Sequence, residues 1–309
     1  MDLRLGVRWR RLERTAMLTA ETIAEARRAV RTARGQGRRV GLVPTMGALH
    51  EGHLSLMAAA RAECEFVAVS IFVNPIQFGP NEDYQRYPRP IERDLAACRE
   101  AGVDLVFAPS AGEMYRQERL TSVVVRGMTE GLCGRQRPGH FEGVTTVVAK
   151  LFNILDPDAA YFGEKDAQQA LVLRKMVVDL DFPIAMRFCP TVREADGLAL
   201  SSRNAYLSAD ERERALCLSR GLEAGRRMIA EGRTEAAAIA AAMRRIIEAA
   251  EPEKIDYIEI VDPHTLGPVA RVAGPVLMAT AVRIGRTRLI DNILVDSQGN
   301  KIRMNDLFL

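Results

Sequence analysis

Lysine and aromatic residues are scarce in this sequence of 309 residues. Five of its 43 basic residues are lysines, aromatic residues make up 6% of the chain, and there is one tryptophan. The 40 acidic residues almost balance the basic ones, so the formal net charge is only +3. Nucleic-acid-binding modules need basic or aromatic stripes, so this composition argues against a nucleic-acid partner. Because lysines are few, a lysine at a chemically suggestive position stands out.

Cysteine pairs and long apolar runs are also missing. The cysteines are odd in number and form no C-x-x-C pair, which predicts reduced, mostly buried thiols: Cys64, Cys98, Cys133, Cys189 and Cys217. No run reaches the roughly 18–20 apolar residues of a membrane helix, so we expect no membrane partner. Residues 1–16 lack the apolar core of a signal peptide and are predicted to be a disordered extension. We therefore expect a cytoplasmic protein.

The order of apolar runs predicts two domains of different class. Residues 17–192 alternate β-branched runs with helical periodicity, which predicts a doubly wound parallel α/β sheet. Its expected strands are 40–45, 66–73, 103–109, 159–163 and 184–190, and its expected helices are 19–34, 53–63, 91–102, 143–155 and 166–180. Residues 193–295 carry expected helices at 209–231 and 235–250, then strands at 255–262, 276–284 and 288–295. This order predicts a smaller α+β domain, and residues 296–309 are expected to be a tail.

The first candidate site is VPTMGALHEGHLSL, residues 43–56. Gly47 allows a tight turn after the expected strand, and His50 and His53 share one face of the helical turn that follows. Free N–H groups and the helix dipole attract anions there, and Gly52 leaves room for close approach. We therefore favour phosphate binding. The alternatives are two solvated histidines at a helix start, or a metal site, although zinc-binding H-E-x-x-H motifs space their histidines four residues apart.

Two further segments place polar side chains after expected strands, where open α/β sheets bind ligands. Asn74, Pro75 and Gln77 follow the strand at 66–73, and an amide at Gln77 suits hydroxyl and carboxylate groups of a small substrate. An ordinary loop amide is the alternative there.

Lys165 follows the strand at 159–163 and precedes a helix, which is a favourable place for a phosphate. Gln168 and Gln169 lie on the first turn of that helix and could face the same cleft. The alternative for Lys165 is a solvated surface side chain.

The last candidate loop is LSSRN, residues 200–204, at the expected domain junction. Its serine hydroxyls and arginine fork suit a di- or triphosphate, and a capped turn before the next helix is the alternative. RPGHFEGV, residues 137–144 with His140, is a weaker candidate. Residues 79–90 contain three prolines and are predicted to form a mobile lid.

These motifs together resemble those of one enzyme family. P-T-M-G-A-L-H-E-G-H resembles the HIGH motif of Rossmann-like nucleotidylyl transferases, and L-S-S-R-N looks like their second phosphate loop. With F-V-N-P-x-Q-F, G-H-F-E-G-V and Y-F-G-E-K-D-x-Q-Q, they closely resemble the pantothenate synthetase, or pantoate–β-alanine ligase, family from about residue 20 to about 295. The resemblance implies that D-pantoate, ATP and β-alanine become pantothenate, AMP and pyrophosphate through a pantoyl-adenylate. It also implies Mg²⁺ and a homodimer.

The resemblance further implies roles for individual residues. It implies catalytic roles for His50, His53, Lys165 and Arg203, and pantoate contacts for Gln77 and Gln169. The residues implied to contact ATP come from three segments: Met46, Gly47, Ala48, Leu49, His50, Glu51, Gly52 and His53; Gly163, Glu164, Lys165 and Asp166; and Val192, Leu200, Ser201, Ser202 and Arg203. No residue is implied as the metal ligand.

Two rival functions are weaker. Another HIGH-type nucleotidyltransferase, acting on a phosphorylated substrate, would want more cations in its acceptor pocket than the amides of Gln77 and Gln169. A nucleotide-sensing or RNA-binding module would want a basic or aromatic stripe.

Because a carboxylate is ionised at neutral pH, the first step on pantoate needs alignment and charge stabilisation rather than a general base. His50, His53, Lys165, Ser202, Arg203 and Mg²⁺ are expected to supply the positive charge or hydrogen-bond donors.

Overall fold

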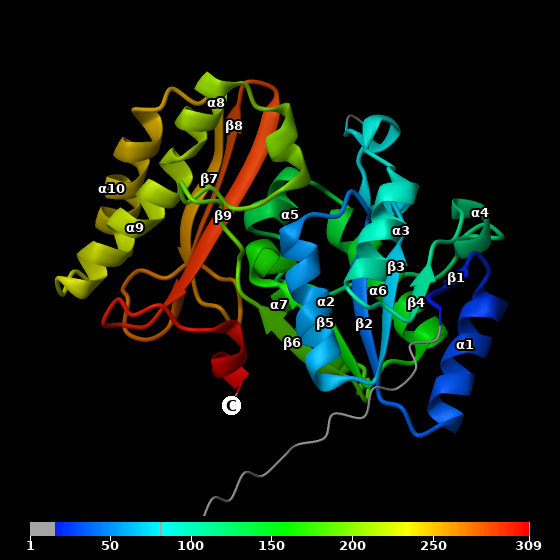
Figure 1. Cartoon of the computed structure of the whole chain (residues 1–309). Coiled ribbons are helices and arrows are strands. Elements are labelled where there is room, and N and C mark those ends of the chain that lie inside the picture. Colours follow the sequence, from blue (N-terminus) through cyan, green and yellow to red (C-terminus); the bar gives the residue numbers. More distant parts are fainter. Residues whose placement is uncertain (1–15, 81, 309) are drawn as a thin grey trace, which may run out of the picture.

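A six-stranded parallel sheet forms the centre of the first half of the chain (Figure 1). The computed structural model describes residues 16–80 and 82–308. The sheet order is β1-β4-β3-β2-β5-β6, with β1 (Leu18–Ala20), β2 (Val40–Thr45), β3 (Phe66–Ile71), β4 (Leu105–Phe107), β5 (Ala159–Gly163) and β6 (Ala185–Cys189). The chain runs outward in one direction from β2 and in the other from β5. The carboxyl ends of these two strands therefore flank the switch point at which open α/β sheets bind ligands.

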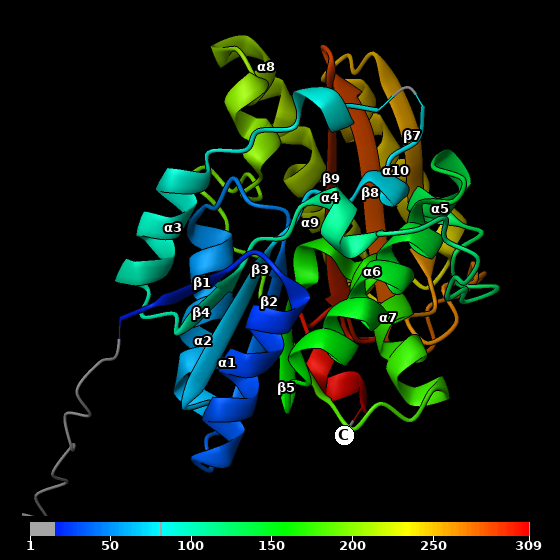
Figure 2. The same cartoon turned by 90° about the vertical axis from the view of Figure 1, so that its right-hand side faces the viewer.

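Helices cover both faces of this sheet because alternate strand side chains point to opposite faces. On β2, Leu42 belongs to the core beneath α1, α6 and α7, whereas its neighbour Val43 belongs to the core beneath α2 and α3. Figure 2 shows α3 and α7 on opposite sides of the sheet. The helices of this part are α1 (Ile23–Gly35), α2 (Glu51–Glu63), α3 (Ile91–Glu100), α4 (Ala111–Met114), α5 (Leu132–Gln136), α6 (His140–Leu155) and α7 (Ala167–Asp179).

A separate antiparallel sheet follows in the second part of the chain, in the order β7-β8-β9. One face packs against α9 and α10 through residues such as Ile258 and Met278, and Figure 1 shows these helices on the side away from the six-stranded sheet. The other face joins the core of the first part through Tyr257 and Leu277. The elements are α8 (Ala209–Ala215), α9 (Cys217–Ala230), α10 (Ala236–Glu248), β7 (Lys254–Val261), β8 (Val276–Ile284) and β9 (Thr287–Val295).

After β9 the chain returns to the six-stranded sheet. A 3₁₀ turn, η5 (Met304–Phe308), lies beside β6 at the point marked C in Figure 1. Asn305 accepts from the main-chain N–H of Phe188 at 3.0 Å and donates to its carbonyl at 2.8 Å. The Met304 side chain is fully buried. The expected tail is thus folded against the edge strand of the first sheet.

The doubly wound parallel sheet and the smaller α+β part are confirmed, with differences in single elements. Residues 18–20 form β1 instead of the start of a helix, because Thr22 caps α1 and β1 pairs with β4. The helix expected at 209–231 is two helices that meet at Leu216. The domain boundary at residue 192 stays a prediction, and most of the expected extension, residues 1–15, lies outside the described residues.

None of the helices in the described ranges is long and apolar enough to cross a membrane.

Candidate active site

The first motif forms a tight turn that a buried carboxylate holds. Gly47 has a φ of +79°, and a Cβ there would lie 2.8 Å from the Asp94 carboxylate. Asp94, from α3, accepts from the main-chain N–H groups of Ala48 at 2.8 Å and Leu49 at 2.9 Å. The main-chain N–H groups of Ala48 and Leu49 therefore stabilise the turn. The side chains of these two residues do not line the cavity described below. Sequence reasoning missed Asp94.

The two histidines stand at the start of α2 with their rings in contact. His50 is the N-cap residue, and its Nδ1 accepts from the Gly52 N–H at 3.1 Å. His53 Nδ1 accepts from the His50 N–H at 3.3 Å, and the ring centroids are 4.2 Å apart. Because both Nδ1 atoms accept hydrogen bonds, each neutral ring carries its proton on Nε2.

Burial keeps these histidines uncharged. It lowers the pKa of His53 to about 3, with a further contribution from His50. The pKa of His50 is also lowered, first by burial and then by the positive charge of Lys165. At neutral pH the pair therefore offers two Nε2–H donors and no positive charge.

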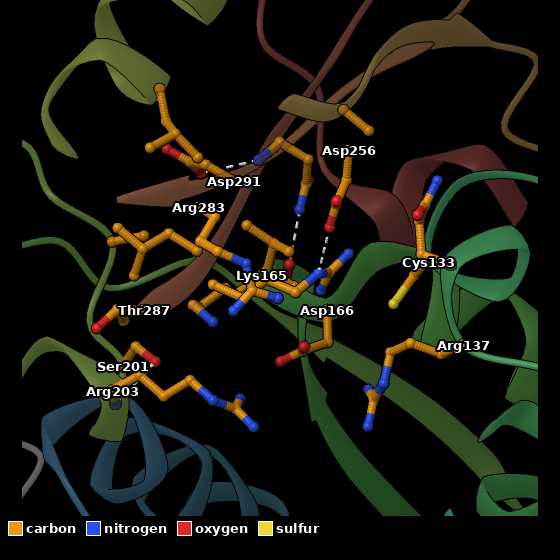
Figure 3. Close-up of a pocket in the computed structure, with 18 of the residues that line it drawn as sticks. Cys133, Arg137, Lys165, Asp166, Ser201, Arg203, Asp256, Arg283, Thr287 and Asp291 are labelled. Atoms are coloured by element: carbon orange, nitrogen blue, oxygen red, sulfur yellow. Dashed lines mark hydrogen bonds and ion pairs between the residues drawn. The ribbon is translucent and has the colours of Figure 1, made fainter. Parts of the chain in front are cut away.

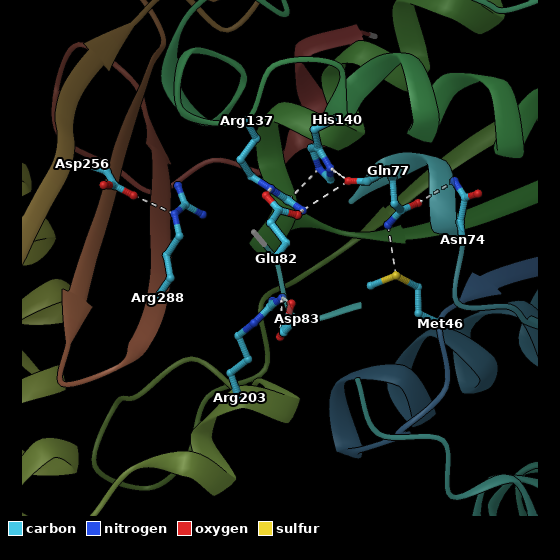
Figure 4. Close-up of polar contacts among 10 residues, drawn as sticks. All are labelled: Met46, Asn74, Gln77, Glu82, Asp83, Arg137, His140, Arg203, Asp256 and Arg288. Carbon is cyan, nitrogen blue, oxygen red and sulfur yellow. Dashed lines mark hydrogen bonds and ion pairs between the residues drawn. The ribbon is translucent and has the colours of Figure 1, made fainter. Parts of the chain in front are cut away.

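The loop after β3 is a rigid amide cluster. Asn74 is buried, donates to Gln77 Oε1 at 3.1 Å and to the Gly143 carbonyl at 3.1 Å, and accepts from the Tyr115 hydroxyl at 2.8 Å. Gln77 Nε2 lies 3.0 Å from the Met46 sulfur, so the second motif contacts the first directly (Figure 4). Asn74 thus orients Gln77, whose amide faces the cavity.

Lys165 lies on a 3₁₀ turn, η3 (Glu164–Asp166), between β5 and α7. Within the described ranges, the ion pairs formed by lysines involve Lys175, Lys254 and Lys301, and Lys165 forms none. The carboxylate of its neighbour Glu164 accepts from the Met304 N–H at 3.0 Å, and burial raises the pKa of Glu164. The Lys165 side chain lines the cavity, whereas that of Glu164 contacts the C-terminal turn.

The LSSRN segment, residues 200–204, is called the serine–arginine loop below. It lies across from Lys165 and runs into a 3₁₀ turn, η4 (Ser202–Tyr206). Ser201 Oγ accepts from the Arg203 N–H at 3.2 Å, and the Leu200 N–H donates to the Val192 carbonyl at 3.0 Å. The Arg203 side chain is paired with the carboxylate of Asp83 at 3.3 Å. Any anion that binds Arg203 therefore competes with Asp83.

Two adjoining cavities collect the polar groups of these motifs. Figure 3 shows the larger of the two. The smaller has a volume of about 230 Å³ and the larger about 950 Å³. Both are lined by Lys165, Asp166, Gln169, Ser201 and Arg203. The larger cavity extends to the second sheet, where Asp256 and Arg288 form an ion pair at 2.7 Å.

Most of the expected site residues meet around the smaller cavity. Those that line it are Met46, His50, Gly52, His53, Gln77, Gly163, Lys165, Asp166, Gln169, Val192, Leu200, Ser201, Ser202 and Arg203. The expected residues that do not line it are Gly47, Ala48, Leu49, Glu51 and Glu164. Gln168, the neighbour of Gln169, is buried and donates to the carbonyls of Met128 and Gly131 at 3.0 Å, which is a structural role.

The loop 79–90 is tied to the site through two acidic residues (Figure 4). Glu82 forms a two-bond pair with Arg137 at 2.6 and 2.5 Å, and Asp83 pairs with Arg203. His140 Nδ1 lies 2.8 Å from the Gln77 carbonyl, and its Nε2 lies 3.0 Å from Arg137. Burial and the Arg137 charge lower the pKa of His140 to about 4, so His140 is a neutral bridge between the loop and Gln77.

Comparisons with known proteins point to one family. A family model described as pantoate-beta-alanine ligase matches residues 18–294. A pantothenate synthetase from Moorella thermoacetica is 57% identical over 276 residues, which cover 89% of this chain and 98% of the relative. The crystal structure of a pantothenate synthetase from Thermus thermophilus matches with a TM-score of 0.85 and 50% identity, covering 90% of this chain and 99% of that one. A pantoate-beta-alanine ligase from Francisella tularensis, complexed with beta-gamma ATP and beta-alanine, matches with a TM-score of 0.76 and 34% identity, covering 90% and 98%.

Proposed function

The chain belongs to the pantoate–β-alanine ligase family, and we propose that it joins its two substrates through a pantoyl-adenylate formed in the smaller cavity. The observation that carries this proposal is the convergence of the motifs. The histidine pair, Gln77, Lys165 and the serine–arginine loop come from distant parts of the chain and line one space. The ligase activity, which uses ATP, follows from the family and from relatives covered over nearly their whole length.

The cavity suits pantoate at one wall. Val144, Val147 and Leu151 of α6 form an apolar surface that matches the two methyl groups of pantoate, and the amides of Gln77 and Gln169 face its hydroxyl groups. The pantoate carboxylate is ionised at neutral pH, so its oxygen attacks the α-phosphorus of ATP without a base. The bond to pyrophosphate breaks as the new P–O bond forms. The protein has to align the two groups and stabilise the charge that grows on pyrophosphate.

Neutral and charged donors divide this task. The Nε2–H groups of His50 and His53 point from the positive end of α2 and donate to phosphate oxygens. Lys165 and Arg203 supply positive charge, and Ser201 and Ser202 supply hydroxyl donors. Four other expected ATP contacts that line the cavity, Met46, Gly163, Val192 and Leu200, are proposed as surfaces for the nucleoside.

Mg²⁺ fits this cavity as an ion carried by ATP. In the described ranges no group of three or more His, Cys, Asp or Glu is placed to hold a metal ion. Mg²⁺ in nucleotide sites needs only one or two carboxylates besides the phosphates. Among the residues that the structure describes, Asp166 is the one acidic residue that lines the smaller cavity. We propose Asp166 as its protein ligand. When bound, Mg²⁺ would neutralise part of the phosphate charge.

The second step needs a dry site and a path for β-alanine. The adenylate is a reactive mixed anhydride, so water must be kept out until the amine of β-alanine attacks its carbonyl carbon and AMP leaves. The larger cavity adjoins the smaller one and provides the path. The loop 79–90, held through Glu82 and Asp83, is the proposed cover. We further propose a cytoplasmic homodimer, as the family resemblance implies.

The test of the two-step reaction is isotope exchange between ATP and pyrophosphate. With pantoate, ATP and Mg²⁺ but no β-alanine, we expect the enzyme to exchange labelled pyrophosphate into ATP, because adenylation is reversible. Leaving out pantoate is the control and should abolish exchange. Absence of exchange at saturating Mg²⁺ would contradict the adenylate intermediate, and exchange without pantoate would favour a different nucleotidyltransferase.

A further inference from the structure

The turn that carries Lys165 is held by a side chain from the second sheet. Asn292 lies on β9, and its amide nitrogen donates to the carbonyl of Lys165 at 2.7 Å and to the carbonyl of Glu164 at 3.1 Å. A side-chain amide has two N–H groups, and each finds one carbonyl of the turn. Asn292 therefore fixes the main chain at the base of the Lys165 side chain, although 127 residues separate the two.

Asn292 is itself held by the residue before it. Its main-chain N–H donates to the Asp291 carboxylate at 2.8 Å, and both terminal nitrogens of Arg193 reach that carboxylate at 2.7 and 2.8 Å. The Asp291 side chain is only 3% exposed, so leaving this carboxylate without Arg193 is costly. Figure 3 shows Asp291 and Lys165 at the same cavity. Strand β9 is therefore a firm support for the Asn292 amide.

Lys165 depends on such a support. Its ammonium ends a flexible side chain and has no ion-pair partner in the described ranges, so the position of the charge follows from the position of the main chain. Arg203 differs, because its guanidinium is held by Asp83. Of these two cations, the lysine thus relies on its turn for its placement.

We propose that Asn292 is a positioning residue that sets the Lys165 ammonium against the departing pyrophosphate of ATP. The inference rests on the proposed function, because it requires Lys165 to act in adenylate formation. Charge on pyrophosphate is greatest in the transition state, so a displaced ammonium weakens the transition state more than it weakens bound substrates. Loss of the Asn292 amide therefore lowers kcat of the exchange reaction and leaves the KM for pantoate almost unchanged.

The test compares ATP–pyrophosphate exchange in Asn292→Ala, Asn292→Gln, Lys165→Ala and the double variant Asn292→Ala/Lys165→Ala. Asn292→Ala should lower kcat about tenfold, and Asn292→Gln, which keeps the amide donors, should recover most of the loss. Because Asn292 acts through Lys165, the double variant should be no slower than Lys165→Ala. Asn300→Ala is the matched control, since that exposed amide donates to Asp296 at 2.9 Å, and it should keep the wild-type rate.

Three results would overturn the positioning role. The first is an Asn292→Ala rate within about twofold of wild type, and the second is an equal further loss when the change is added to Lys165→Ala. The third is a loss of rate that follows the loss of folded protein in thermal melts and is not rescued by Asn292→Gln. Failure of the proposed function is seen separately, as a wild-type enzyme without exchange or as Lys165→Ala with the wild-type rate. Either result removes the premise of the positioning role.

Discussion

Burial decides what single groups around the smaller cavity can contribute. Burial lowers the pKa values of His50 and His53, with a further contribution from the charge of Lys165 at His50 and from His50 at His53. From the sequence, both positive charge and hydrogen-bond donation were open to them, and the structure favours donation. The positive charge in the cavity therefore falls to Lys165 and Arg203.

Replacing these groups should slow adenylation without unfolding the protein. We expect Lys165→Ala and His50→Ala each to lower the single-turnover rate of adenylate formation by more than about tenfold, because each removes a hydrogen-bond donor that we propose for the phosphates. Circular dichroism should be unchanged. Lys175→Ala is the control, since that exposed lysine pairs with Asp179 far along α7. Near-wild-type adenylation would reject the role assigned to the substituted residue.

The buried histidine also makes the folded protein sensitive to acid. His53 titrates near pH 6.5 when unfolded, whereas burial lowers its pKa to about 3 in the folded state. The unfolded state therefore binds the proton first, and stability that is complete above pH 6.5 is lost as the pH falls toward 3. At pH 5 the loss from this one group should be about 2 kcal/mol. Urea unfolding at pH 7.5 and pH 5 measures it.

His53→Gln should remove this part of the pH dependence, because glutamine does not titrate. His264→Gln, the same change at an exposed histidine, is the matched control and is measured at the same two pH values. Equal losses of stability in wild type and His53→Gln would show that His53 is not held neutral.

Short-range patterns revealed the residues that touch the cavity but not those that hold them. His50, His53, Lys165, Ser201 and Arg203 lie in short motifs after strands or at turns, so spacing alone indicates their chemistry. Asp94 lies 46 residues from Ala48 in the turn that it holds, and Asn292 lies 127 residues from Lys165. Nothing local distinguishes a buried Asp94 in IERDLAACRE from a solvated one, because its partners are main-chain amides.

The helices and strands that depend on distant partners are likewise difficult to predict from the sequence. Strands such as β2 and β5 are apolar runs and were expected with their observed bounds. Strand β1 has three residues and exists because it pairs with β4, and η5 exists because Asn305 bonds to the edge of β6. Periodicity reports local geometry and burial, whereas pairing across the sheet is decided by the whole fold.

We expect Asp83 of the loop 79–90 to compete with the phosphates of ATP for Arg203. Asp83 pairs with Arg203 at 3.3 Å, so an ATP phosphate that binds Arg203, as we propose, would have to displace this carboxylate. Both side chains are partly exposed, so the contact is weak and its loss should have a modest effect. We expect Asp83→Asn to lower the KM for ATP by about twofold to fivefold, as measured in steady-state kinetics.

Asp179→Asn is the matched control for Asp83→Asn, because it makes the same change in an exposed ion pair. It should leave the KM for ATP unaltered. A raised KM for ATP in Asp83→Asn would show instead that Asp83 helps to close the loop over bound nucleotide.

In the whole molecule, the second part of the chain completes the site built by the first. The carboxyl ends of β2, β3 and β5 supply the histidine turn, the amide cluster and the lysine turn. The second part adds the serine–arginine loop, one side of the larger cavity and the support from β9. Residues 300–308 then return to β6 and to Glu164. Glu164 and Lys165, the first two residues of the lysine turn, therefore both contact the last quarter of the chain.

This arrangement predicts opposite effects of shortening the two ends. Deletion of residues 1–16 should leave activity unchanged, because the first strand of the sheet starts at Leu18 and the residues that line the smaller cavity lie further along the chain. Deletion of residues 300–309 should cost about 3 kcal/mol of unfolding free energy, because it removes the buried Met304 side chain and the two bonds of Asn305 to β6. It also frees Glu164, so ATP–pyrophosphate exchange should fall even at temperatures where the protein stays folded.

Thermal melts and exchange rates of the two truncations, measured side by side, check both expectations. Full exchange activity and an unchanged melting temperature after the C-terminal deletion would show that the return of the chain to β6 supports neither the sheet nor the lysine turn.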